Sequence, residues 1–195
     1  AHITPNEWLT FPNMEAPLTM AADMQTILPN LAQSWEVSAD GRRITLTLRK
    51  GIKWSDGAPL SSDDFLFTFN NIWLNTEYSP VPSRNVEGGR AVKVDDLTFY
   101  YEFDEPRPLM VNLLANYGDF FVDPLHYYKD FHPAFTDRET LKQRIADMGL
   151  LTWMAFYHAA KRQLIEESAQ VPTLAAHRVV SRTPTRVLLE RNPYY

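Results

Sequence analysis

An alternating pattern in residues 34–49 constrains the fold more than any other feature of the chain. In its second half, Ile44, Leu46 and Leu48 alternate with polar residues, which is the period of a β-strand with one buried and one solvated face. The first half alternates in the same way. A turn ending at Gly41 separates the halves, and glycine adopts positive φ at no steric cost. The stretch therefore predicts a β-hairpin of an antiparallel sheet.

A helix is predicted to begin shortly after this hairpin, at Ser61. Ser61 and Asp64 have the spacing of a capping box, with Asp in place of the usual Glu or Gln. Acidic side chains in the first turn also interact favourably with the positive end of the helix dipole. Apolar residues at helical spacing continue to about Leu74. We therefore expect a helix that packs one wide apolar face against the sheet.

The rest of the chain predicts strands and helices in separate runs. We expect a short strand or helix within 18–28, a long loop over 75–91, a strand over 97–103, helices over 109–116, 138–148 and 151–169, a short turn or helix after Pro124, and strands over 177–181 and 186–191. Because strands and helices do not alternate strictly, the predicted class is α+β, with an antiparallel sheet and packed helices.

Length and charge set further limits on function. A chain of 195 residues can form one domain. The net charge is −5, with acidic and basic residues interspersed, so we expect no nucleic-acid partner, because phosphate binding needs a concentrated basic surface. Cysteine is absent, which excludes disulfides and thiol catalysis. No apolar run approaches the roughly 20 residues that span a bilayer. The first residues contain no leader pattern and no initiator Met, and we expect a processed or excised chain.

Motifs for catalysis or metal binding are not found in the sequence. The five histidines are scattered without metal-ligand spacing, and we expect His126 to be a hydrogen-bonded structural residue. Asp40 and Asp56 each precede a glycine and are predicted to bond their own turns. Adjacent acids occur at 63–64, 95–96 and 166–167, but neighbouring side chains point in different directions. A hydrolase with a carboxylate pair assembled by folding stays open as an alternative.

The many aromatic residues allow two interpretations. Trp35, Trp54, Trp73 and Trp153 could form a stacking platform, as in a carbohydrate-binding module. Their positions within the apolar patterns favour core packing instead. Tyr78, in the long predicted loop, is the aromatic residue that packing explains least.

One block of sequence resembles a known family. It consists of PNLA at 29–32, SWEVS at 34–38, DG at 40–41, LR at 48–49, GI at 51–52, Trp54, DG at 56–57, PL at 59–60 and DF at 64–65. In order and spacing these are similar to the family 5 extracellular solute-binding proteins, the peptide- and nickel-binding receptors of ABC importers. VDD at 94–96, EP at 105–106, PLH at 124–126 and RNPYY at 191–195 are weaker echoes of the same family.

The resemblance implies a fold, a function and partners. It implies that residues 1–195 are one domain, a fragment of a larger two-lobed protein with a periplasmic-binding-protein type II-like fold. It further implies a monomeric receptor, periplasmic or a cell-surface lipoprotein, that passes peptides or similar small solutes to an ABC permease. No enzyme activity, cofactor or metal is expected. The ligand-binding candidate is Tyr78, because the loop after the helix would approach the cleft.

The sequence departs from the family pattern in one segment. A Gly-Thr-Gly-Pro-Tyr-like segment usually precedes the last strand, and this chain has PTLAA at 172–176. We therefore do not expect this segment to make the contacts that the family's usual segment makes.

Overall fold

The computed structural model describes residues 15–117, 121–161, 171–183 and 186–195. The chain divides into two compact units by its contacts. The first, here called the sheet unit, comprises residues 14–52 and 59–123. The second, the helix–hairpin unit, comprises 1–13, 53–58 and 124–195. The short segment 53–58 thus belongs to a different unit from the residues that flank it in sequence.

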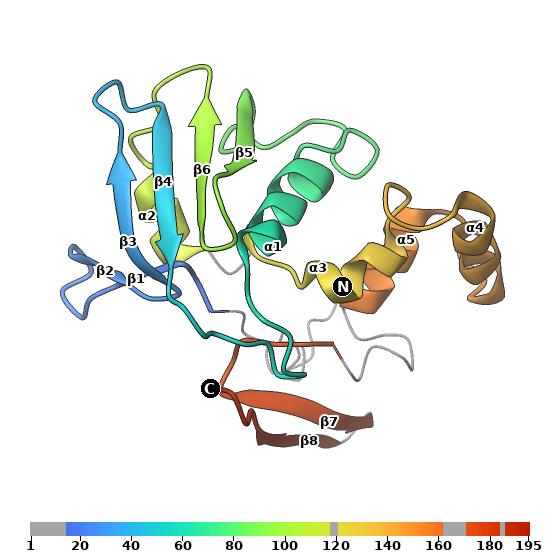
Figure 1. Cartoon of the computed structure of the whole chain (residues 1–195). Helices are drawn as coiled ribbons and strands as arrows, with labels where there is room; N and C mark the ends of the chain where they lie inside the picture. Colours follow the sequence, from blue (N-terminus) through green and yellow to red (C-terminus); the bar gives the residue numbers. More distant parts are fainter. Residues whose placement is uncertain (1–14, 118–120, 162–170, 184–185) are drawn as a thin grey trace. The chain divides into compact units, whose positions relative to one another are not determined.

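A four-stranded antiparallel sheet forms the centre of the sheet unit (Figure 1). Its spatial order is β3 (Ala32–Val37), β4 (Arg43–Leu48), β6 (Thr98–Phe103) and β5 (Gly89–Lys93). β3 and β4 are the hairpin that the alternating pattern predicts, and Gly41 in its turn has a φ of 70°. The α+β class with an antiparallel sheet is therefore confirmed.

Aromatic residues of one helical segment pack on the inner face of this sheet. α1 (Ser62–Leu66) continues as a π-helical segment, η1 (Phe67–Trp73). The ring centroids of Phe65 and Phe99 lie 4.8 Å apart, and those of Phe69 and Tyr101 lie 4.7 Å apart. At the helix start, Asp64 Oδ2 accepts the backbone N–H of Ser61 at 3.0 Å. The predicted helix start is thus confirmed, and its apolar face forms the core.

A smaller sheet and a second helix complete the sheet unit. β1 (Leu18–Met20) and β2 (Ile27–Pro29) pair antiparallel, so the predicted element within 18–28 is a strand pair. α2 (Met110–Asn116) packs against β1. Leu18 and Leu114 are fully buried.

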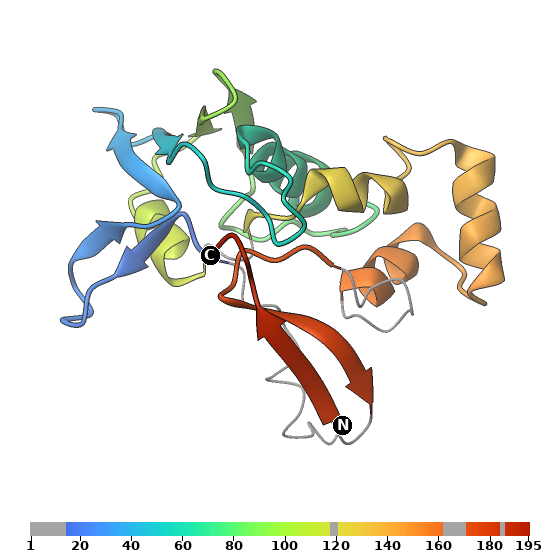
Figure 2. The same ribbon diagram turned by 60° about the horizontal axis from the view of Figure 1, so that its bottom comes forward.

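The helix–hairpin unit contains four helical segments and one β-hairpin among the described residues (Figure 2). The helices are α3 (Leu125–Tyr128), η3 (Lys129–Phe131), α4 (Arg138–Asp147) and α5 (Trp153–Lys161). The hairpin is β7 (His177–Thr183) with β8 (Arg186–Arg191). Asp137 Oδ2 accepts the N–H of Thr140 at 2.9 Å and caps α4. The predicted helix over 151–169 is observed as α5, and residues 162–169 lie outside the described residues.

The strand β5 was not predicted, and its residues 89–91 lie in the long loop that the sequence predicts over 75–91. Gly88 has a φ of 67°, but Gly89 is the first residue of β5. A Cβ on Gly89 would lie 2.6 Å from the ring of Phe103. Gly89 therefore lies in a strand and not in the predicted loop, and its lack of a side chain permits a close approach of the strand to the Phe103 ring.

One side chain pairs with part of the outer edge of β5. Asn70, on η1, donates from Nδ2 to the carbonyl of Ala91 at 2.8 Å. Its Oδ1 accepts the N–H of the same residue at 2.9 Å. The amide thus makes the two hydrogen bonds that a further strand would make. An unpaired strand edge invites association with other chains, and Asn70 removes part of that edge.

We predict that Asn70→Ala lowers the free energy of unfolding by about 1–3 kcal/mol, because it leaves a partly buried donor and acceptor unpaired. Asn70→Asp should also destabilise, since a carboxylate accepts from the Ala91 N–H but cannot donate to its carbonyl. Urea unfolding followed by circular dichroism measures both. Asn85→Ala, at an exposed loop asparagine, is the control and should stay within about 0.5 kcal/mol of the parent. Equal stability of Asn70→Ala and the control would contradict the strand-edge role.

Candidate functional site

A tight turn over residues 53–58 contributes to the candidate site of the helix–hairpin unit. The N–H of Trp54 donates to the carbonyl of Ala58 at 2.8 Å. Asp56 Oδ1 accepts the N–H of Ala58 at 3.1 Å, as predicted for a turn aspartate. Gly57 has a φ of 93°, and the hydroxyl of Tyr194 lies 2.9 Å from where its Cβ would be. Glycine is therefore required here for both backbone conformation and space.

His126 holds this turn against α3. Its Nε2 lies 2.7 Å from Asp56 Oδ2. The imidazole ring also contacts the ring of Trp54, with 6.3 Å between centroids. Trp54 itself is fully buried. The prediction that His126 is a hydrogen-bonded structural residue is therefore confirmed, and its partner is one of the two predicted turn aspartates.

Residues near the end of the chain close the other side of the turn. Ser55 and Thr173 exchange two hydrogen bonds of 3.0 Å, one through the backbone of Ser55 and one through its hydroxyl. Asn192 is buried and donates from Nδ2 to the carbonyl of Ala175 at 2.9 Å. Its Oδ1 accepts the N–H of Tyr194 at 3.0 Å. Three segments far apart in sequence are thereby fixed to one another.

These segments enclose a hollow of about 490 Å³, which we call the turn–hairpin hollow. It is lined by Ser55, Asp56, Tyr127, Val171, Pro172, Arg178, Val179, Val180 and Glu190. Arg178 of β7 and Glu190 of β8 face each other in register and form an ion pair. The hollow thus combines apolar walls with a few placed polar groups, which is the usual composition of a small-molecule site.

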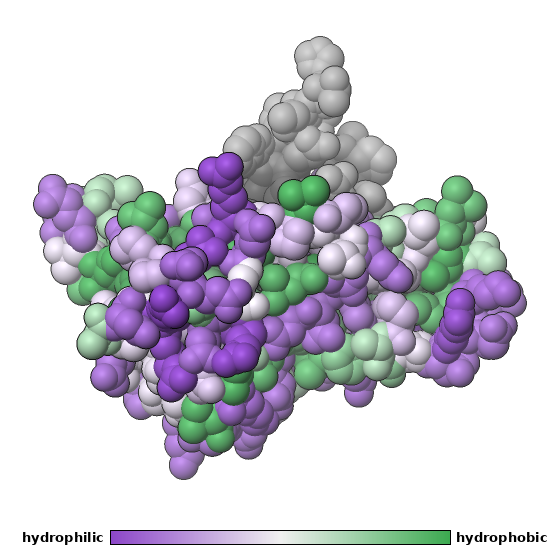
Figure 3. All heavy atoms as spheres, turned by 90° about the horizontal axis from the view of Figure 1, so that it is seen from above, coloured by the Kyte–Doolittle hydropathy of each residue, from purple (hydrophilic) through white to green (hydrophobic). Residues whose placement is uncertain are grey.

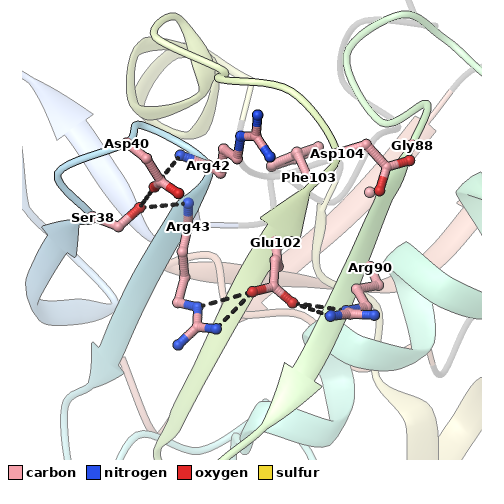
Figure 4. Close-up of a pocket in the computed structure, with 10 residues that line it drawn as sticks. Ser38, Asp40, Arg42, Arg43, Gly88, Arg90, Glu102, Phe103 and Asp104 are labelled. Atoms are coloured by element: carbon pink, nitrogen blue, oxygen red, sulfur yellow. Dashed lines mark hydrogen bonds and ion pairs between the residues drawn. The ribbon is translucent and has the colours of Figure 1, made fainter.

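A second hollow, of about 610 Å³, lies at the hairpin end of the four-stranded sheet (Figure 4). Glu102 of β6 lies between two arginines and binds both: Arg43 Nη2 at 2.6 Å, and Arg90 Nε at 2.9 Å. The hydrogen bonds from Arg43 and Arg90 lower the pKa of Glu102 below its usual range. Seen from above, hydrophilic surface gathers in this region, with hydrophobic patches among it (Figure 3). These ion pairs connect β6 to its two neighbouring strands, β4 and β5. We therefore interpret the cluster as structural.

A third hollow, of about 380 Å³, is mainly apolar and also belongs to the sheet unit. Trp73 of η1 and Phe121 form one wall, with 6.3 Å between ring centroids. Leu113 and Tyr117 from the end of α2 form another. Its described lining residues include no charged side chain. It therefore has fewer groups than the turn–hairpin hollow that could orient a polar ligand.

Comparison with known proteins identifies the family. The model described as bacterial extracellular solute-binding proteins, family 5 Middle, matches residues 26–195. The chain belongs to this family. The resemblance that the sequence indicates is therefore confirmed, as is the match to a fragment of the periplasmic-binding-protein type II fold.

Relatives in family 5 differ in the solutes that their names give. The chain is 33% identical, over 92% of its length, to a periplasmic alpha-galactoside-binding protein of Rhizobium meliloti strain 1021, of which it covers 24%. Among solved structures, an oligopeptide-binding protein OppA has a TM-score of 0.87 and 31% identity, with 100% of this chain and 31% of OppA covered. MelB of Agrobacterium fabrum C58, solved with stachyose, has a TM-score of 0.71 and 30% identity, covering 94% and 27%. The chain spans about a quarter to a third of these relatives.

The predicted site residue of this family 5 chain, Tyr78, lies after η1 and is half-buried. Its backbone N–H donates to Asn75 Oδ1 at 3.4 Å. It does not line any of the three hollows described above, and its role in ligand binding stays a prediction.

The tryptophans do not support a stacking platform. Trp54 and Trp153 are buried, which removes both from any exposed surface. Trp35 pairs with Leu46 in register and so shares the inner face of the sheet, where core packing was predicted. Trp73 packs against Phe121. Trp35 and Trp73 are half-buried, so the case against a platform rests on the burial of Trp54 and Trp153.

Carboxylates that were candidates for acid–base chemistry have structural partners. Lys93 Nζ binds Asp63 at 2.7 Å and Asp96 at 2.8 Å. Asp56 and Glu190 do line one hollow, but each pairs with a basic side chain. Each of these carboxylates is thus engaged by a basic side chain, and none of them gives support to the hydrolase alternative. Glu166 and Glu167 lie outside the described residues.

The described residues include neither a metal-binding cluster nor a membrane-spanning helix. No cluster there of three or more histidine, cysteine, aspartate or glutamate side chains could hold a metal ion. None of the described helices has the length and apolar character to cross a bilayer.

Sequence reasoning missed Ser55, Tyr127, Arg178 and Glu190 as lining residues of the turn–hairpin hollow. Arg178 and Glu190 lie on predicted strands whose pairing would have placed them opposite each other. Ser55 and Thr173 are 118 positions apart, and no local signal joins them.

We predict that Glu102→Gln lowers the melting temperature at pH 7, because it removes the anion that both arginines bind. A lowered native pKa means that this stability is present above the usual pKa of 4.5 and is lost as the pH falls through the native value. The difference in melting temperature should therefore shrink below about pH 4.5. Differential scanning calorimetry measures it.

Glu36→Gln, at an exposed glutamate of β3 in the same sheet, is the matched control and should change the melting temperature little at any pH. A pH-independent loss in Glu102→Gln would show that the side chain acts through shape and not through its charge.

Proposed function

We propose that this chain is part of the substrate-binding component of an ABC importer for peptides or similar small solutes, oligosaccharides included. The observation that carries the proposal is the family match over residues 26–195, together with relatives named for binding an α-galactoside and a dipeptide. These relatives are binding proteins and not enzymes, and we assign no catalytic activity to the chain.

The proposed architecture is that of a larger receptor. Residues 1–195 are one domain of a two-lobed, monomeric protein that is periplasmic or a cell-surface lipoprotein. The lobes close about a hinge on the solute, and the closed receptor delivers it to a permease in the membrane. The fraction of each relative that the chain spans supports this division.

Within this chain, the turn–hairpin hollow is the proposed solute-facing wall. Its volume falls within the range of about 300–1,000 Å³ that is usual for ligand pockets. The hydrogen bonds of Asn192 and those between Ser55 and Thr173 also hold the lining segments in place. This support favours the hollow as a binding site. A preorganised site loses less conformational freedom on binding.

Isothermal titration calorimetry tests this proposal on the full-length protein and on the 195-residue chain. The full-length receptor should bind a member of a panel of peptides and oligosaccharides with micromolar or tighter affinity. The isolated chain should bind at least about 100-fold more weakly, since one wall buries only part of a ligand. Binding of no panel member by the full-length receptor would contradict the proposed function, and equal affinity of the isolated chain would contradict the two-lobed site.

Tyr78 remains our candidate for a contact from the sheet unit. In the same titration, Tyr78→Ala in the full-length protein should weaken binding about tenfold, as loss of an aromatic contact at a ligand does. Tyr100→Ala, at a half-buried tyrosine of β6 that lines none of the three hollows described above, is the control. If both variants bind like the parent, Tyr78 is a loop residue without a ligand contact.

A further inference from the structure

We propose that the turn–hairpin hollow takes a neutral, hydroxyl-rich solute of the oligosaccharide class and not a peptide. This inference rests on the proposed function and narrows it to one substrate class. It follows from how the charged side chains of the hollow are already engaged, from the hydrogen-bonding groups that this leaves, and from the apolar surface beside them.

Among the described residues that line the hollow, each charged side chain already has a side-chain partner. Arg178 forms an ion pair with Glu190 across the β7–β8 hairpin. Asp56 Oδ2 lies 2.7 Å from His126 Nε2, and its Oδ1 accepts the N–H of Ala58. A free peptide has an ammonium and a carboxylate at its ends, and a closed site must compensate both. Here each peptide terminus would have to share a charged group with that group's existing partner.

The same pairs are well suited to hydroxyl groups. A hydroxyl donates one hydrogen bond and accepts up to two. The carboxylates of Glu190 and Asp56 retain acceptor lone pairs beyond those used by their partners, and the guanidinium of Arg178 has five N–H donors. Acceptors and donors therefore lie side by side in the hollow, and neighbouring hydroxyls of a sugar ring can bond both without separating the charges.

Apolar groups line the remainder of the hollow. Val171, Pro172 and Val179 contribute aliphatic surface, and Tyr127 contributes a half-buried ring. That ring is supported by Phe131, with 5.4 Å between the centroids and 29° between the planes. Sugar rings present C–H groups between their hydroxyls, and such surface gains free energy when it leaves water. The hollow thus offers polar and apolar surface in the mixture that a pyranose ring presents.

Calorimetric titration of the full-length protein tests the inference, with stachyose, maltotetraose and cellotetraose as neutral sugars and tetra-alanine as the peptide. We expect at least one tetrasaccharide to bind at least about 100-fold more tightly than tetra-alanine. Tighter binding of tetra-alanine overturns the inference and leaves the proposed function standing. Binding of neither class, here or in the wider panel, overturns both.

Two variants locate the effect in this hollow. Glu190→Gln leaves Arg178 without its anion, and it should weaken tetrasaccharide binding about tenfold or more, as loss of a charged hydrogen-bonding group does. Asp56→Asn keeps an oxygen for the turn but loses the charge opposite His126, and should weaken binding in the same direction. Glu105→Gln, at an exposed glutamate of the sheet unit, is the matched control. Unchanged affinity in both hollow variants, with melting temperatures confirming that they fold, would overturn the inference.

Discussion

Aromatic packing between the α1–η1 segment and β6 is the interaction on which the sheet unit depends. Alternate residues of β6 point inward, and Phe99, Tyr101 and Phe103 are all buried. Phe65 and Phe69 pack against them at ring distances below 5 Å for the nearest pairs. Each such side chain buries a large apolar area, so one strand and one helical segment supply much of the core. The aromatic faces of β6 and of the α1–η1 segment are held together by three features. These are the strand register, the capped start of α1, and the hydrogen bonds of Asn70 to the edge of β5.

In the helix–hairpin unit, the corresponding constraint is the turn at 53–58. Its glycine allows Tyr194 to pack closely, and its aspartate engages His126. Ser55 then joins the turn to the segment at Thr173. A turn that is bonded on three sides is rigid, and rigidity is what a binding wall requires. In this way the residues that carry the family resemblance at 54–57 also position the lining of the turn–hairpin hollow.

Local features of the sequence predicted local structure well. The β3–β4 hairpin follows from strict alternation and a turn glycine, and the α4 cap at Asp137 follows from the preference of aspartate for that position. β5 was missed because it is five residues long and begins at a glycine. The π-helical form of η1 has no sequence signal of its own, and the amide of Asn70 gains its role only when that segment lies beside β5.

The candidate site was less predictable for a physical reason. The turn–hairpin hollow is assembled from segments more than 100 positions apart, and its polar lining looks like ordinary turn and strand residues until the chain folds. Family membership could be predicted because the residues of the 29–65 block resemble those of the family in order and spacing. The solute class that we propose rests on how non-local charges pair, which the sequence alone does not give.

Native mass spectrometry of the full-length protein, purified without added ligand and then denatured, tests the central claim most directly. The claim is that this chain is one wall of a solute receptor. It predicts a protein species heavier than the sequence mass by one small molecule, and release of that molecule as a neutral oligosaccharide on denaturation. A protein that carries no solute, and that gains none when incubated with oligosaccharides or peptides, would contradict the claim.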